Sequence, residues 1–321
     1  MVLAIKAEKL RIGYLDERDD VLWAVKGISF EVSEGEIYCI VGESGSGKST
    51  VALAVSGILP PHAVTAGELY VYGNLVIKGE ERSYEKIRGK LVTYVPQSPG
   101  TSLNPYLTLE DQFYYVLKSL RGSIRKEAKA EAKKYLEMAG LDPTSTLDRY
   151  PHELSGGMQQ RAAIALALST GARVLVADEP TSSLDAHLRL QIINLLRRLR
   201  DEARLTVIFI THDLLLASRV SDKVAVMYAG SLAEIGEVRE VLLKPLHPYT
   251  SMLVNVIPTL GVKKEFKYYF GEPPKPGSIN EGCPFFERCP YRFSKCAAEK
   301  PELLVAEGDR YVACWLYNNR G

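Results

Sequence analysis

The sequence predicts an α/β fold with a mainly parallel sheet, an antiparallel β subdomain and an irregular cysteine-rich C-terminal extension. Two observations predict it. Short apolar runs alternate with amphipathic helical patterns through residues 1–245, and helices between strands are the usual connection in parallel sheets. After that point the composition changes, because four of the five cysteines and eight of the 17 prolines lie beyond Leu246. We therefore expect a domain at 1–245 and an extension at 246–321.

The elements are expected in the following order. Segments 3–10, 24–32 and 68–77 read as antiparallel strands that flank the main sheet. The apolar run 36–41 reads as a buried strand that ends at a glycine-rich loop, and a helix follows over 48–57. The same patterns predict further strands at 90–95, 173–177 and 205–210, and helices at 107–120, 126–139, 155–169 and 188–199.

Charge and hydropathy exclude several classes of protein. The chain has 40 Lys and Arg residues against 39 Asp and Glu residues, a net charge of +1, which argues against a nucleic-acid ligand held by a basic surface. The longest apolar stretch, 162–168, is far shorter than the about 20 residues of a membrane-spanning helix. The N-terminus lacks the pattern of a signal peptide. We expect a cytosolic chain, unless a partner holds it at a membrane.

A phosphate-binding loop is the first motif that carries chemistry. The segment 42–49, GESGSGKS, fits G-x-x-x-x-G-K-[ST] without a mismatch and follows an apolar strand. Backbone N–H groups can surround a triphosphate only where side chains stay away, and the following helix adds its positive end. Lys48 is expected to reach the β- and γ-phosphates, and the Ser49 hydroxyl to bind Mg²⁺. The expected ATP-binding residues are Gly42, Ser44, Gly45, Ser46, Gly47, Lys48, Ser49 and Thr50.

Two adjacent carboxylates complete a nucleotide site. The buried run 174–177 ends at Asp178 and Glu179, at the edge of the sheet where ligands bind in open α/β folds. Asp178 is expected to hold Mg²⁺, and Glu179 to polarise a water for attack on the γ-phosphate. Together with the glycine-rich loop, the pair predicts a P-loop NTPase core.

A second glycine-bearing loop opens another helix at 154–161, LSGGMQQR. A helix N-terminus with two glycines and a serine is also a phosphate-binding device. One nucleotide needs one such cradle, so the second cradle is expected to serve a nucleotide bound to a different chain. This predicts head-to-tail pairing of two ATPase domains.

The segment LSGGMQQR resembles the signature of the ATP-binding cassette (ABC) superfamily, and the resemblance extends over residues 1 to about 245. It implies an ABC-type core with a helical subdomain at about 97–170. It also implies that Gln97 is the Q-loop residue near Mg²⁺, that His212 is the switch histidine and that Tyr14 stacks on adenine, with Trp23 as a rival. The resemblance assigns catalysis to Lys48, Gln97, Glu179 and His212, and contact with the partner's ATP to Ser155, Gly156, Gly157 and Gln159.

Segments 101–105, 150–153 and 247–250 resemble the oligopeptide/dipeptide importers in particular. The resemblance implies an ATPase subunit at the cytoplasmic face of the membrane. There it would pair with a second ATPase subunit, and both would dock onto two permease subunits fed by an external solute-binding protein. Related importers carry nickel or oligosaccharides, so these substrates stay open.

Two other functions are weighed against an importer subunit. The interval 97–154 is too short for the coiled-coil arm of an ABC ATPase that works on chromosomes. The presence of both Glu179 and His212 argues against a regulator that only senses nucleotide.

Cysteines 283, 289, 296 and 314 form the least determined part of the sequence. Their spacing matches neither the C-x₂₋₄-C pairs of zinc sites nor the C-x₂-C run of bacterial ferredoxins, and disulfides are uncommon in the cytosol. The residues alone leave a metal, a cluster, disulfides and free thiols open. The segment 282–296, GCPFFERCPYRFSKC, resembles the importers' C-terminal extension, which implies a four-iron four-sulfur cluster on Cys283, Cys289, Cys296 and Cys314.

Overall fold

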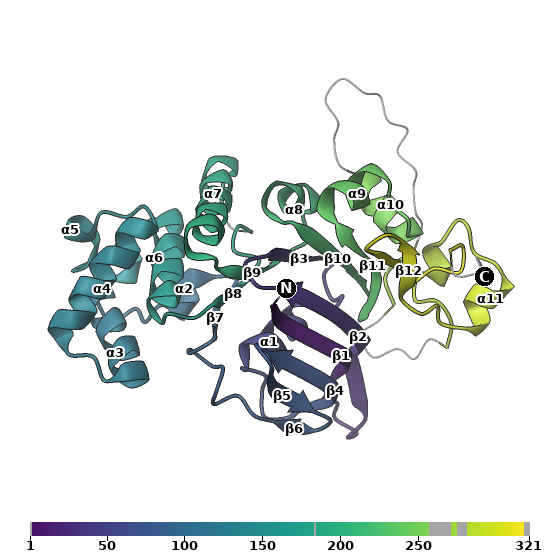
Figure 1. Ribbon diagram of the computed structural model, residues 1–321, viewed down its shortest axis with the longest axis horizontal. Helices are drawn as coiled ribbons and strands as arrows, with labels where there is room; N and C mark the ends of the chain where they lie inside the picture. Colours follow the sequence, from purple (N-terminus) through teal and green to yellow (C-terminus); the bar gives the residue numbers. More distant parts are fainter. Residues whose placement is uncertain (1, 183, 257–270, 275–280, 318–321) are drawn as a thin grey trace.

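The computed structural model describes residues 2–182, 184–256, 271–274 and 281–317. Figure 1 shows a central sheet with a group of helices at one end, an antiparallel sheet beneath it and the C-terminal extension at the other end. In the described part of the chain, no helix is long and apolar enough to cross a lipid bilayer.

The antiparallel sheet has the strand order β2-β1-β4-β5-β6. Its long strands, β1 (Leu3–Leu15) and β2 (Val21–Ser33), contain the segments expected at 3–10 and 24–32 and extend beyond them. The segment expected as one strand at 68–77 is instead the hairpin of β4 (Ala63–Val71) and β5 (Asn74–Lys78), followed by β6 (Glu81–Arg82). The chain turns at Tyr72 and Gly73, which have φ angles of 46° and 73°. A two-residue turn with two positive φ angles suits the twist of a hairpin.

The central sheet has the order β12-β13-β11-β10-β3-β9-β8-β7. Parallel pairing joins the strands β10 (Lys223–Tyr228), β3 (Ile37–Val41), β9 (Thr206–Thr211), β8 (Val174–Asp178) and β7 (Val92–Val95). Every residue of β3, β8 and β9 is buried, as expected for strands covered on both faces.

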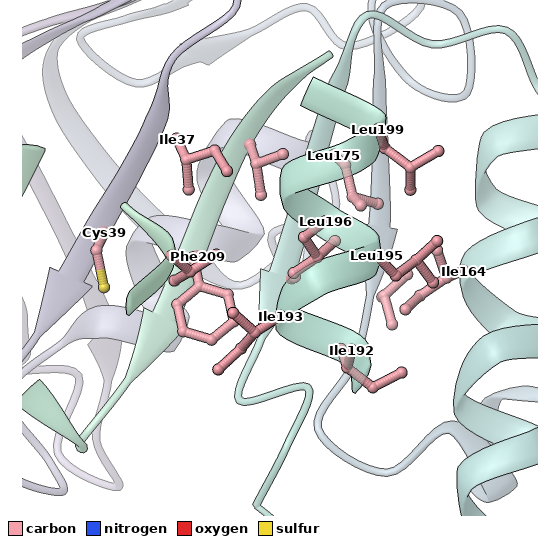
Figure 2. Packing of buried hydrophobic residues seen from close by; sticks show 14 of the residues in the cluster. Ile37, Cys39, Ile164, Leu175, Ile192, Ile193, Leu195, Leu196, Leu199 and Phe209 are labelled. Carbon is pink, nitrogen blue, oxygen red and sulfur yellow. The ribbon is translucent and has the colours of Figure 1, made fainter. Parts of the chain in front are cut away.

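Alternate side chains of these strands enter two different cores. Ile37, Cys39 and Phe209 pack on the same side as the leucine and isoleucine stripe of α7 (Ala186–Ala203), as Figure 2 shows. Tyr38 and Ile208 point to the other face, into the core shared with α1 (Lys48–Ser56) and the antiparallel sheet. This division fixes the register of the strands, and their parallel pairing places their carboxyl ends at one edge.

The helical group lies between β7 and β8 in the chain. It comprises α2 (Pro99–Ser102), α3 (Leu109–Arg121), α4 (Arg125–Met138), α5 (Pro143–Thr146), the 3₁₀ turn η1 (Pro151–Glu153) and α6 (Gly156–Ser169). Helix α3 begins two residues later than expected because the Thr108 side chain caps it and accepts a hydrogen bond from the Asp111 N–H. Leu109, Phe113 and Leu117 form its buried face.

The chain returns to the sheet through α8 (Leu214–Val220), β10, β11 (Ser231–Glu237), α9 (Val238–Leu243) and α10 (Pro248–Asn255). The extension at 246–321 thus begins with α10, and its described part also holds η2 (Phe286–Arg288), α11 (Ser294–Ala298), β12 (Leu304–Glu307) and β13 (Arg310–Val312). The expectation of an irregular extension needs a correction, because β13 pairs with β11 and β12 pairs with β13, so that the extension adds two strands to the central sheet.

One buried carboxylate joins the extension to this sheet. Glu234 in β11 is fully buried and accepts a hydrogen bond from Arg310 Nη2 at 2.6 Å. The same carboxylate accepts the backbone N–H groups of Leu246 and His247, with the shortest distance 2.9 Å to His247. A buried charge needs such partners, so Glu234 holds the start of the extension and strand β13 in place.

Candidate functional site

The phosphate loop lies between the end of β3 and the start of α1. Gly45 and Gly47 have φ angles of 78° and 98°, in the region that favours glycine. A Cβ on Gly47 would lie 2.5 Å from the carbonyl oxygen of Ala24 in β2, and one on Gly42 would lie 2.2 Å from that of Met227 in β10. The loop can therefore close against these two strands only with glycine at both positions.

Lys48 is the first residue of α1 and its side chain is buried beneath the loop. Its Nζ atom donates to the carbonyl oxygens of Gly42 at 2.8 Å and of Glu43 at 2.9 Å. Burial lowers the pKa of Lys48, and the nearby carboxylates of Glu179, Asp178 and Glu43 act in the opposite direction. The loop thus holds an ammonium group that can exchange backbone carbonyls for phosphate oxygens.

Asp178 is the last residue of β8 and carries the candidate Mg²⁺ site. Its Oδ1 accepts from the Ser49 hydroxyl at 3.2 Å, and its Oδ2 from the Tyr94 hydroxyl at 3.1 Å. Burial raises the pKa of Asp178, while these two hydrogen bonds lower it. A carboxylate beside a serine hydroxyl is the oxygen donor set that a hard cation such as Mg²⁺ takes, so Ser49 and Asp178 fit this role.

Glu179 meets two predicted catalytic residues at the same edge of the sheet. Gln97 Nε2 donates to Glu179 Oε2 at 3.1 Å, and His212 Nδ1 lies 3.3 Å from Oε1. The three residues follow β7, β8 and β9, whose carboxyl ends are adjacent because these strands are parallel. Glu179 has a φ of 44°, an uncommon conformation for a residue other than glycine, and such strain gathers at functional sites.

Tyr14 lies in β1 and is partly buried. Its hydroxyl donates to the Thr50 hydroxyl of α1 at 3.5 Å, and its ring centroid is 6.0 Å from that of His62. The rival Trp23 has the Arg11 guanidinium 3.9 Å above its ring centroid. Tyr14 therefore reaches the helix that the phosphate loop opens, whereas one face of Trp23 is covered by its own chain.

The signature segment begins helix α6. Ser155 caps the helix and accepts the Met158 N–H at 3.4 Å, and both Ser155 and Gly156 are exposed. Gly157 is buried, and a Cβ there would lie 3.0 Å from the Leu188 methyl groups. Among the residues that the structure describes, no hydrogen bond or ion pair joins this segment to the phosphate loop. In Figure 1, α6 lies in the helical group, whereas α1 lies under the sheet.

Gln159 is turned toward its own chain. Its Nε2 donates to the carbonyl oxygens of Pro151 at 2.9 Å and of Leu154 at 3.1 Å. The amide thus braces the loop that leads into the signature, and its contact with a partner's ATP stays a prediction.

The four clustered cysteines gather within the extension. The Cys283 N–H donates to the Cys296 carbonyl oxygen at 2.7 Å. Burial raises the pKa of the Cys283 thiol to about 11 and that of Cys314 to about 12, and the other three thiols add to the shift at Cys314. In the described residues, however, no three or more Cys, His, Asp or Glu side chains are arranged to hold a metal ion. The four cysteines expected as ligands therefore lie in one region, but their side chains are not arranged as a metal site.

Three contacts of the site escaped the sequence analysis. Tyr94 binds Asp178, and its position near the end of a strand beside β8 is a signal that could have identified it. Tyr249 and Arg288 both contact Glu43 of the phosphate loop. No local pattern indicates these two, since Arg288 is 245 positions from its partner.

Comparisons with known proteins agree with this geometry. Residues 25–182 match the ABC transporter family, and residues 233–296 match the oligopeptide/dipeptide transporter C-terminal region. The dipeptide transport ATP-binding protein DppD of Bacillus subtilis is 39% identical, with 92% of this chain and 90% of that protein covered. The oligopeptide transport ATP-binding protein OppD of Escherichia coli is 37% identical, with 97% and 92% covered.

A solved structure has the same fold. The ATP-binding cassette MJ0796, in a dimeric post-hydrolysis state bound to ADP and Pi, is 30% identical with a TM-score of 0.64, and the alignment covers 73% of this chain and 99% of that one. The phosphate loop, the paired carboxylates and the signature helix thus occur in a fold already known for this chemistry. The chain belongs to the ABC transporter family, among the ATP-binding proteins with an oligopeptide/dipeptide transporter C-terminal region.

Proposed function

We propose that this chain is the ATP-hydrolysing subunit of an ABC importer for oligopeptides or dipeptides. The observation that carries the proposal is the position of Glu179, held by Gln97 and His212 at the sheet edge that also bears Asp178. The similarity to peptide-transport ATP-binding proteins over more than nine-tenths of the chain supports the substrate class.

The catalytic proposal assigns a separate task to each group. The Glu179 carboxylate, positioned beside Gln97 and His212, orients and deprotonates the attacking water. Lys48 and His212 stabilise negative charge on the transferred phosphoryl group. Ser49 and Asp178 would hold Mg²⁺, with Gln97 beside them, and the ion when bound neutralises charge on the β- and γ-phosphates.

The adenine and the phosphates are bound by a larger set of residues. Tyr14 stacks on the base in this proposal, and the backbone N–H groups of the loop surround the phosphates. The residues proposed to bind the nucleotide are Tyr14, Gly42, Ser44, Gly45, Ser46, Gly47, Lys48, Ser49, Thr50, Gln97 and Asp178.

The second half of each site is proposed to come from a partner ATPase subunit. Ser155 and Gly156 are exposed at the positive end of α6, a helix of 14 residues, so they can cap a nucleotide on the partner. Closure of the two subunits excludes water from the γ-phosphate and completes the charge-stabilising groups. Hydrolysis cleaves the γ-phosphate from ADP, release of this phosphate weakens the bridge between the two subunits, and the pair opens.

Transport then requires contact with two permease subunits at the cytoplasmic face of the membrane, which receive solute from an external binding protein. We propose that the segment from Gln97 to Arg121 transmits the closing motion, since it leads from the catalytic edge into the helical group. The side chains of Tyr106 and Tyr115 are 87% and 51% exposed there, and exposed aromatic residues are typical of protein interfaces.

The test is peptide-stimulated ATP turnover in liposomes that contain the chain with its cognate subunits and binding protein. In this assay Glu179→Gln is expected to lower turnover by about 10² or more, because general-base assistance is lost, while labelled ATP still binds. Glu202→Gln, an exposed change near the end of α7, is the matched control. Normal turnover in the Glu179 variant would remove Glu179 from its role, and turnover that ignores peptide would remove the transport assignment.

For the extension we propose an iron–sulfur centre on Cys283, Cys289, Cys296 and Cys314 that has a structural or regulatory role. The support is the donor chemistry: four thiols lie in one segment, Cys296 and Cys314 buried and the other two partly buried, and the other three thiols raise the pKa of Cys314. A thiol with a raised pKa binds a metal only as the thiolate, so the metal itself must favour ionisation. Anaerobic purification should give about four irons and four sulfides per chain, and a colourless, iron-free protein would contradict the proposal.

A further inference from the structure

The extension reaches the phosphate loop through one residue of that loop, Glu43. Arg288 Nη1 donates to Glu43 Oε2 at 2.8 Å, and Nη2 donates to Oε1 at 3.0 Å. This is the two-pronged geometry in which a guanidinium and a carboxylate bind most strongly. The Arg288 side chain is only 8% exposed, against 28% for Glu43, so solvent screens the pair little.

Arg288 is fixed by groups from two other parts of the chain and by a ring of its own segment. Its Nη1 lies 3.3 Å from the Tyr228 hydroxyl at the end of β10, and its Nη2 lies 3.4 Å from Met252 Sδ in α10. The guanidinium carbon is 5.7 Å from the ring centroids of both Tyr228 and Phe285. A guanidinium held on so many sides has few other positions, so its partner Glu43 is held with it.

The backbone of Glu43 is held as well. Its N–H donates to the hydroxyl of Tyr249 at 2.9 Å, and Tyr249 is fully buried. Its carbonyl oxygen accepts from Lys48 Nζ at 2.9 Å. A shift of Glu43 would therefore move one of the two carbonyl groups that position the phosphate-binding lysine.

The negative charge of Glu43 also affects the binding of a triphosphate. A carboxylate within a loop that receives a triphosphate repels the ligand unless a cation compensates it. Glu43 is near enough to act electrostatically on Lys48. Arg288 compensates this carboxylate and directs both its oxygens toward the extension.

We propose that Arg288 is a positioning residue of the ATP site, supplied by the C-terminal extension: it neutralises Glu43 and fixes the phosphate loop in the form that binds nucleotide. The inference rests on the proposed ATP-hydrolysing function and adds to it that the extension acts on ATP affinity. Arg288 lies in η2, in the interval between Cys283 and Cys289, so the fold of the cysteine segment sets its position.

The experiment compares four proteins in the assembled transporter: wild type, Arg288→Ala, Glu43→Gln and the double variant. Arg288→Ala leaves the Glu43 carboxylate without its counter-ion, so KM for ATP is expected to rise at least tenfold, with kcat within about twofold of wild type. The double variant also removes the negative charge of Glu43, so its KM for ATP is expected to lie within about threefold of that of Glu43→Gln.

A residue that only packs the extension would give a different pattern. In that case Glu43→Gln would not restore the affinity lost in Arg288→Ala, and that result would overturn the proposal, as would an unchanged KM in Arg288→Ala. Arg292→Ala is the matched control, because this exposed arginine donates to the Glu287 carbonyl oxygen in the same segment. If Arg288→Ala does not fold, Arg288→Gln, which keeps the aliphatic stem, replaces it under the same criteria.

Direct binding of labelled ATP to the same proteins separates the two proposals. If wild-type protein binds ATP without hydrolysing it, the proposed function fails, yet the tenfold loss of affinity in Arg288→Ala and its recovery in the double variant still decide the role of Arg288.

Discussion

Three residues of the candidate site have a conformation or a burial that lowers the stability of the nucleotide-free folded chain. They are Asp178, Lys48 and Glu179. Asp178 and Lys48 are buried ionisable groups whose pKa values are shifted toward their neutral forms by desolvation. Glu179 keeps a positive φ that a glycine would adopt more readily. Such costs persist where the surrounding structure holds the arrangement, and they cluster at functional sites.

Asp178→Asn is therefore expected to stabilise the nucleotide-free chain. The amide keeps an oxygen for Ser49 or Tyr94 and removes a buried charge, and replacements of this kind at functional sites give about 0.5–2 kcal/mol. Urea denaturation at neutral pH without nucleotide or Mg²⁺ measures the gain. A variant less stable than wild type would show that the charge of Asp178 is stabilising in the free chain.

The gain should also depend on pH in a defined direction. The folded-state pKa of Asp178 is raised above its ordinary value of 3.8, so the folded chain binds this proton more tightly than the unfolded chain. Wild type consequently loses stability as the pH rises through the window that begins at 3.8 and ends at the raised pKa. The difference in the free energy of unfolding between Asp178→Asn and wild type should be small below this window and should reach its full size above it. A difference that does not depend on pH would contradict the raised pKa of Asp178.

At the scale of elements, strand β11 connects the catalytic core with the extension. It pairs with β10 on one side and with β13 on the other, and its Glu234 side chain binds Arg310 and two backbone N–H groups of the chain that follows. The extension is thus built into the edge of the sheet rather than appended to it.

Glu234→Ala is expected to destabilise the protein by about 3–5 kcal/mol, because Arg310 would be left buried without its counter-ion. The transition should be measured by thermal unfolding, followed by limited proteolysis to show whether the extension is cleaved first. Glu307→Ala is the control: its pair with Lys244 has both side chains more than 60% exposed, and it should change stability by less than about 1 kcal/mol. Equal effects of the two variants would contradict the role given to Glu234.

The sequence predicts elements well where the pattern is local. Strands β3, β8 and β9 follow from apolar runs, and α7 follows from a leucine stripe. The β4–β5 hairpin was missed because an alternating pattern continues through its turn, although Tyr72-Gly73 is a turn signal in retrospect. The strands of the extension were missed because β13 has only three residues, and its pairing with β11 depends on contacts nearly eighty positions apart.

At the scale of the whole molecule, the two helix ends proposed to bind phosphate, those of α1 and α6, lie on different parts of one chain. The proximity of Lys48, Asp178 and Glu179 could be predicted because they belong to motifs of defined spacing, whereas their catalytic roles stay proposals. The Arg288–Glu43 pair could not, since neither residue type nor spacing relates positions so distant, and only the fold brings the extension onto the loop. The complete site, in this account, needs a second chain as well.

The most direct measurement is nucleotide-dependent association. Glu179→Gln protein, alone and mixed with its cognate second ATPase subunit, is examined by sedimentation velocity with Mg²⁺ and either ATP or ADP. We predict a dimer with ATP that is lost with ADP, and that is also lost when Gly156→Glu places a carboxylate in the exposed signature of this chain. Two results would contradict this prediction. One is the absence of an ATP-dependent dimer, both for this chain alone and for its mixture with the second subunit. The other is a dimer that persists in the Gly156→Glu variant.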